Sequence, residues 1–199
     1  MTAGKGITHS EMFPLLRQDT TNRLELFQIW INLPSRNKMA DPHFSMLWAE
    51  TLPYKTFTDE GGKKTTVCTI AGKLEGGGEP PEPPPASWAS QDGSDVSIWT
   101  IDLEAGATWT LPAAKGGAGV KRTLYFFRGG ETSSLSVAGQ RLRAHSAVGL
   151  SPTADVAIVA DAAGGCECLL LQGRPIAEPV VQHGPFVMNT KKEIQQVRA

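Results

Sequence analysis

Cysteine and net charge are both scarce in this 199-residue chain. Its three cysteines, Cys68, Cys166 and Cys168, are an odd and low number, which excludes a disulfide scaffold and favours a reducing compartment. The 19 basic and 20 acidic residues leave a net charge of −1. No overall field therefore draws the chain onto nucleic acid or an anionic membrane.

Long hydrophobic runs are also absent from the sequence. No run approaches the ~20 apolar residues of a membrane helix, and the chain does not open with the basic and apolar regions of a signal peptide. We therefore expect a cytoplasmic or nuclear protein without direct contacts to membrane or nucleic acid. In a nucleus it would act through a protein partner.

Short segments rich in Val, Ile, Trp and Phe, separated by glycine and proline turns, make up most of the sequence. This spacing predicts an all-β sandwich or barrel. Near the C-terminus, Thr190 and Glu193 have the spacing of a capping box and Ile194 and Val197 follow three apart, which predicts a short helix. The expected strands are residues 26–33, 65–71, 96–103, 122–127, 134–137, 148–150, 156–160 and 166–171.

Two segments allow more than one interpretation. The glycine and proline run at 76–85 fits neither helix nor ladder, so it is a linker or exposed insertion, with a proline-rich ligand as the alternative. Cys166 and Cys168 are two apart on a predicted strand and could hold zinc, but structural zinc needs four ligands in spaced pairs. We expect ordinary strand cysteines.

His9 and Glu11 are the candidate metal ligands of the sequence. Residues two apart in an extended strand point to the same face, so an imidazole and a carboxylate would stand side by side. A 2-His-1-carboxylate iron centre already uses three protein groups and leaves positions open for substrate or O2. The pair would therefore need partners from elsewhere.

Three segments of the chain resemble the pirin family of two-domain cupins. Residues 1–12, which contain His9 and Glu11, are similar to the end of the metal-binding part of a pirin N-terminal cupin. Residues 27–42, beginning Phe-Gln-Ile-Trp-Ile-Asn-Leu-Pro, resemble the next strand and its exit loop. Residues 178–194, with Glu-Pro-Val-Val-Gln-His-Gly-Pro-Phe-Val-Met-Asn-Thr, form a long match near the C-terminus.

The resemblance implies an all-β fold with the remnant of an N-terminal cupin, a complete C-terminal cupin and a short C-terminal helix. The expected divisions are 1–73 for the partial first cupin, 74–92 for the linker, 93–177 for the second cupin and 178–199 for the terminal segment. Part of the first barrel is missing, which predicts an open, apolar surface. We expect it to pair with a protein partner or to form a homodimer.

The resemblance also implies one iron, bound in the family by three histidines and a glutamate. His9 and Glu11 match the last two of these ligands, and the other two come from a His-x-His on an earlier strand. The remaining histidines, His43, His145 and His183, stand alone and form no His-x-His. We expect His43 and His145 on the surface and His183 in a structural hydrogen bond, so only half of the iron site is present.

Two functions from different classes follow. The first is a pirin-type iron protein, either a quercetin 2,3-dioxygenase acting on a flavonol-type substrate or an iron-dependent transcription cofactor. The second is a metal-free interaction or scaffold module built on the C-terminal cupin. The enzymatic activity requires that the missing ligands be supplied.

Overall fold

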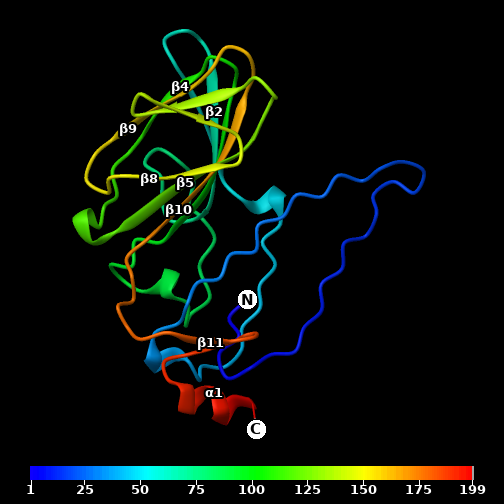
Figure 1. Cartoon of the computed structure of the whole chain (residues 1–199), viewed down its shortest axis with the longest axis vertical. Helices are drawn as coiled ribbons and strands as arrows, with labels where there is room; N and C mark the ends of the chain where they lie inside the picture. Colours follow the sequence, from blue (N-terminus) through cyan, green and yellow to red (C-terminus); the bar gives the residue numbers. More distant parts are fainter. Residues whose placement is uncertain (199) are drawn as a thin grey trace.

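A computed structural model of the chain describes residues 1–198. Two antiparallel sheets pack face to face, and both ends of the chain lie below them (Figure 1). The larger sheet contains, in spatial order, β1 (Tyr54–Thr58), β2 (Lys64–Ala71), β3 (Ser97–Leu103), β10 (Cys166–Gly173), β5 (Lys121–Gly129) and β8 (Ser146–Gly149). The smaller sheet contains β4 (Thr108–Leu111), β9 (Val156–Ala160), β6 (Ser134–Val137) and β7 (Gln140–Arg143).

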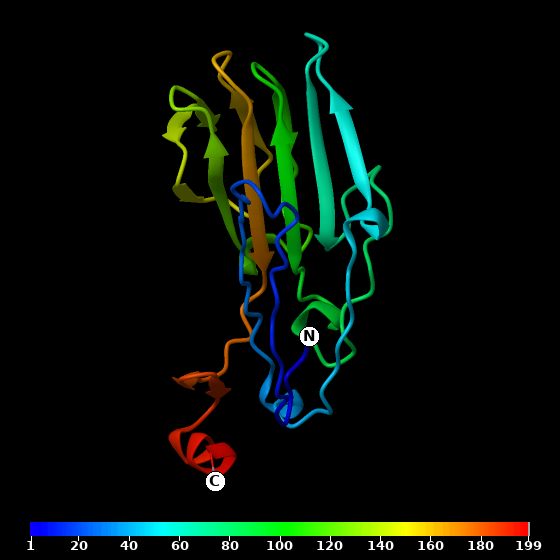
Figure 2. The same cartoon turned by 90° about the vertical axis from the view of Figure 1, so that its right-hand side faces the viewer.

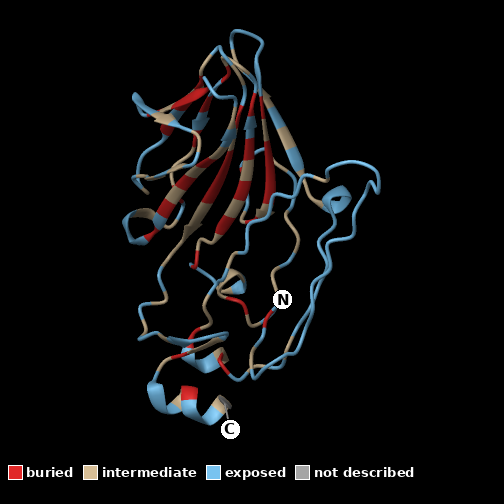
Figure 3. Ribbon diagram, turned by 45° about the vertical axis from the view of Figure 1, so that its right-hand side comes forward, coloured by how far each residue is buried: buried red, intermediate tan, exposed pale blue. Residues whose placement is uncertain are grey.

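The core lies between the two sheets, where buried residues concentrate (Figure 3). Side chains of a strand alternate between its two faces. Trp99, Ile101 and Leu103 of β3 accordingly face inward, and Leu124 and Phe126 of β5 join the same cluster. This alternation confirms the predicted all-β architecture, and seven of the eight predicted strands form with small changes in their ends.

A separate unit follows the barrel at the C-terminal end. It consists of the hairpin of β11 (Val181–His183) and β12 (Phe186–Met188) and the helix α1 (Lys191–Arg198). The capping box is confirmed, because Thr190 Oγ1 accepts the Glu193 amide at 3.2 Å and the Glu193 carboxylate accepts the Thr190 amide at 2.7 Å. Among residues 1–198, no helix is long and apolar enough to cross a membrane.

Residues 1–53 form no β-ladder apart from a single bridge between Thr2 and His43. The predicted strand at 26–33 is therefore wrong for this structure, although the segment stays extended and crosses the outer face of the larger sheet (Figure 2). Phe27 packs edge-on against Phe127 with ring centroids 4.8 Å apart. The segment has apolar alternation but no neighbouring backbone to pair with, and a strand needs both.

The parts of the chain on either side of the proline run share one sheet. The predicted strand at 65–71, which we placed in the front portion 1–73, forms β2 and pairs with β3 over most of its length. Five strands, β1, β4, β7, β11 and β12, were not predicted; they are short and carry mixed polar residues. The described residues also contain four 3-10 helices: η1 (Ser35–Asn37), η2 (Ala49–Thr51), η3 (Trp88–Ser90) and η4 (Gly117–Gly119).

Candidate functional site

His9 and Glu11 are both exposed, in an extended stretch that belongs to no strand. Two donors do not make a metal centre, and a non-haem iron site needs at least three protein ligands. Within residues 1–198, no group of three His, Cys, Asp or Glu side chains is placed to hold a metal ion. The structure therefore places the pair at the surface without a third ligand.

The other histidines do not approach this pair as ligands. His43 and His145 are exposed, as expected; His43 contributes backbone to the Thr2 bridge and His145 occupies a left-handed turn with φ of 63°. His183 is exposed in β11, and no side-chain hydrogen bond involves it within the described chain. The expectation of a structural hydrogen bond at His183 is therefore wrong.

Among the buried residues of the described chain there is no His, Asp or Glu, and the ligand-type side chains of the barrel interior are the thiols of Cys166 and Cys168. The polar atoms of this interior on β2 are the hydroxyls of Thr65 and Thr69, which are buried and make no hydrogen bond. Large side chains such as Phe126, Ile101 and Leu170 fill the remaining volume. The space that could hold a cofactor is thus occupied by hydrophobic core.

Cys166 and Cys168 share this apolar environment and are free thiols, as is Cys68. Burial raises the pKa of Cys166 to about 11 and raises that of Cys168 further above its ordinary range. Thiolates, rather than thiols, bind zinc and attack electrophiles. The two residues are therefore inert core cysteines, as the sequence predicted.

This protonation state gives a first testable result. At pH 8 the folded chain should react with a thiol reagent such as 5,5′-dithiobis(2-nitrobenzoate) at none of its three buried cysteines within minutes, because burial raises the pKa of each. In denaturant all three should react. A fast-reacting thiol in the folded protein would contradict the burial of these side chains.

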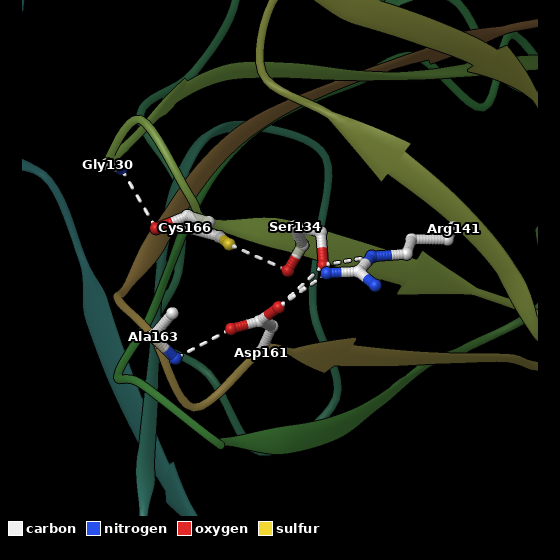
Figure 4. A network of polar contacts seen from close by, with 7 residues as sticks. Gly130, Ser134, Arg141, Asp161, Ala163 and Cys166 are labelled. Carbon is white, nitrogen blue, oxygen red and sulfur yellow. Dashed lines mark hydrogen bonds and ion pairs between the residues drawn. The ribbon is translucent and has the colours of Figure 1, made fainter.

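A polar network at the end of the smaller sheet brings a serine, an aspartate and an arginine together (Figure 4). Ser134 Oγ donates to Asp161 Oδ2 at 2.8 Å and accepts from Arg141 Nε at 2.8 Å, while the Ala163 amide donates to Asp161 Oδ1 at 2.6 Å. These donors lower the pKa of Asp161, the amide of Ala163 contributing most. A carboxylate with a lowered pKa is a weak proton acceptor and therefore a poor general base. The network is a structural clamp between β6, β7 and the turn before β10.

An open groove of about 280 Å³ lies on the outer face of the larger sheet, beneath the extended segment. Ile29 and Trp30 form one side, Ile98 and Leu171 line the sheet, and Lys121 stands at the rim. No His, Cys, Asp or Glu lines it. The groove therefore offers apolar contact and positive charge, but no chemistry of its own.

The three segments singled out in the sequence meet at the lower end of the molecule. The Thr2 and His43 backbones exchange hydrogen bonds of 2.8 and 3.0 Å, and Glu178 accepts hydrogen bonds from Ser35. These contacts, and the roles of Glu178 and Lys38, were not predicted from the sequence. The position of Glu178 and Lys38 inside two of the three segments was the signal that could have pointed to them.

Comparison with known proteins identifies the barrel. The model of the pirin C-terminal cupin domain matches residues 98–199, which is half of the sequence. The chain belongs to the pirin family. The match begins in β3 and includes the later strands of the barrel and the C-terminal unit, whereas β1, β2, His9 and Glu11 lie outside it.

Individual pirins resemble the chain over nearly its whole length. A pirin-like protein of Caulobacter vibrioides is 34% identical over 198 residues, covering 98% of this chain and 62% of that protein. Human pirin is 30% identical over 196 residues, covering 98% of this chain and 60% of that protein. The chain thus spans about three fifths of the length of these relatives.

A solved structure confirms the cupin fold. The crystal structure of quercetin 2,3-dioxygenase from Acinetobacter baumannii has a TM-score of 0.66 and 27% sequence identity to this chain. The similarity covers 85% of this chain and 52% of that one. The expected cupin architecture is therefore correct.

Proposed function

We propose that this chain is a pirin whose C-terminal cupin is a metal-free interaction and scaffold module, and whose His9 and Glu11 are half of an iron site. The observation that carries this proposal is the interior of the barrel, where hydrophobic side chains occupy the space a cofactor would need. The barrel has a structural role. Any metal chemistry would involve His9 and Glu11, the exposed pair that precedes the barrel in the sequence.

The number of metal-ligating side chains decides whether this chain can hold iron by itself. The chain places His9 and Glu11 at the surface, and the described residues add no third side chain of a suitable type beside them. A site with one nitrogen and one oxygen ligand falls short of the three protein groups that ferrous iron needs. The residues present therefore do not fit a complete iron centre.

The alternative is that another segment or chain completes the site. The likeness to the Acinetobacter quercetin 2,3-dioxygenase supports a flavonol-type substrate and oxygen for such a completed protein. Membership of the family to which human pirin also belongs is compatible with an iron-dependent transcription cofactor in cytoplasm or nucleus. The net charge of −1 favours a protein partner over direct contact with nucleic acid.

The surface of residues 1–48 supports an interaction role. Most of the exposed large hydrophobic side chains of the protein lie there, with Leu16 94% and Trp48 61% exposed. Such a concentration of exposed large apolar side chains in one segment favours contact with another protein surface. A protein partner or a second copy would bury these side chains.

Metal analysis of the purified chain tests the proposal. After incubation with ferrous iron and desalting under argon, we expect far less than one iron per chain and no consumption of quercetin. In a titration with Co²⁺ as the probe, any weak binding should fall at least about tenfold in His9→Ala, since a lost ligand outweighs the ~10- to 100-fold of a supporting residue. His145→Ala is the matched control and should change nothing. Stoichiometric, tightly held iron or quercetin turnover would contradict the metal-free module.

A further inference from the structure

The C-terminal unit, residues 178–198, packs on itself rather than on the barrel. Helix α1 contacts β11 and β12, and the unit hangs below the two sheets beside η1 (Figures 1 and 2). Ile194 of α1 is 6% exposed, so the unit has a small core of its own. What fastens this unit to the rest of the molecule is a set of polar contacts with the N-terminal segment.

Glu178 makes the direct connection. Its Oε2 accepts the Ser35 backbone amide at 2.6 Å and Asn189 Nδ2 at 3.0 Å, and its Oε1 accepts the Ser35 hydroxyl at 3.2 Å. Ser35 is the first residue of η1, and the preceding Pro34 provides no side-chain cap. A carboxylate 143 residues away therefore caps the turn that the local sequence leaves uncapped.

Lys38 follows η1 at its C-terminal end, opposite the end that Glu178 caps. Its side chain is 5% exposed and its ammonium donates to Asn32 Oδ1. Lysine is almost never so buried without a compensating partner. Burial lowers the pKa of Lys38, and the carboxylates of Glu178 and Glu193 from the C-terminal unit oppose that effect. Asn32 is thus the hydrogen-bond partner of Lys38, and the carboxylates of the C-terminal unit favour its charged form by longer-range attraction.

Backbone contacts continue from η1 to the segment that carries His9 and Glu11. The Lys5 amide donates to Ala40 O at 2.9 Å, and Lys5 Nζ pairs with Asp41 Oδ1 at 2.6 Å. Thr2 and His43 add the isolated antiparallel bridge. Gly4 has φ of 53°, and a Cβ there would lie 2.0 Å from Ala40 O, so the close approach requires glycine.

We infer that the C-terminal unit is a clasp that holds residues 2–5 in place, and that Glu178 and Lys38 are positioning residues for this stretch, which leads into His9 and Glu11. The path runs from Glu178 through η1 to residues 40–43 and then to residues 2–5. The role of His9 and Glu11 as metal ligands rests on the proposed function. The chain of contacts from Glu178 to residues 2–5 does not, because every one of these contacts exists without a metal.

Hydrogen exchange of the full chain without added metal tests the clasp. In Glu178→Ala, the amides of Thr2, Lys5 and His43 should exchange at least about tenfold faster, because their hydrogen bonds open locally more often. Amides of β3 and β10 should keep their rates. Glu178→Gln retains one carbonyl acceptor and should restore part of the protection.

A matched control separates the clasp from general destabilisation. Asp155 also accepts a backbone amide across the chain, from Ala113 at 2.8 Å, but it lies outside the clasp. Asp155→Ala should leave the Thr2, Lys5 and His43 amides unchanged. If Glu178→Ala does not fold, Lys38→Met keeps the buried stem and should produce the same acceleration.

Unchanged exchange at Thr2, Lys5 and His43 in both Glu178→Ala and Lys38→Met, with faster exchange at Ser35 alone, would overturn the inference. Such a result would limit Glu178 to the local cap of η1. The outcome is independent of iron. Tight metal binding would contradict the proposed function and leave the clasp standing, whereas unchanged exchange would remove the clasp and leave the metal proposal standing.

Discussion

Replacement of Phe126 by alanine should destabilise the protein by about 3–5 kcal/mol, in the range of large-to-small changes in a packed core. Phe126 is fully buried between the sheets, and its ring packs so closely on Gly129 that a Cβ there would lie 2.8 Å from Cζ. Urea unfolding followed by tryptophan fluorescence measures the loss. The same titration gives the slope that reports surface exposure.

The neighbouring Phe127 is the natural control, because it points to the opposite face of β5. It is half-buried and contacts Phe27 of the extended segment. Phe127→Ala should cost only about 1 kcal/mol, since it removes one partly covered ring and one aromatic pair. Equal losses for the two variants would contradict a hydrophobic core between the sheets.

This comparison bears on function as well as stability. A barrel that binds a ligand in its interior tolerates smaller side chains there, because the cavity already exists. A barrel whose interior is filled by close-packed side chains loses stability with every side-chain atom that is removed. A large cost at Phe126 would therefore support the assignment of the C-terminal cupin as a scaffold.

Alanine at Gly72 should destabilise the protein by about 3 kcal/mol. Gly72 follows β2 with φ of 77°, a left-handed conformation that costs other residues roughly 1–2 kcal/mol. A Cβ would also lie 2.5 Å from the carbonyl oxygen of Val96 and 2.4 Å from Ser97 Oγ. Relief of that overlap must move the backbone between β2 and β3, which adds roughly 1–3 kcal/mol. Thermal and urea unfolding measure the sum.

Gly62 separates the two causes. Its φ of 76° is nearly the same, but a Cβ there would meet no atom within 4 Å. Gly62→Ala should therefore cost only the conformational part, about 1 kcal/mol. A Gly72→Ala variant no less stable than Gly62→Ala would show that the β2–β3 junction can yield without loss of packing.

Local patterns predicted the barrel well because its strands carry their own signal. Alternating apolar residues in β3, β5 and β9 define the inward face before any contact is known, and the Thr190 and Glu193 capping box defines the start of α1 within four residues. The short strands β4 and β7 were missed because their residues alternate with or consist mostly of polar side chains: β4 reads Thr-Trp-Thr-Leu and β7 reads Gln-Arg-Leu-Arg.

The segment at 26–33 shows where such patterns fail. It has the composition of a strand, and the structure keeps it extended, yet it pairs with no other strand. Strand composition describes how side chains pack, whereas a ladder also needs a second backbone within hydrogen-bonding distance. His9 and Glu11 have the same limitation, since two correct ligand types do not bring a third beside them.

The sequence by itself determined the family, the all-β architecture, the positions of seven barrel strands and the ordinary strand character of Cys166 and Cys168. Each of these depends on residue identity or on neighbours a few positions apart. Only the tertiary structure decided that the barrel interior is filled, that Glu178 caps η1, and that Lys38 is buried beneath the C-terminal unit. Those features depend on contacts between residues far apart in the sequence, 143 positions for Glu178 and Ser35, which local spacing does not encode.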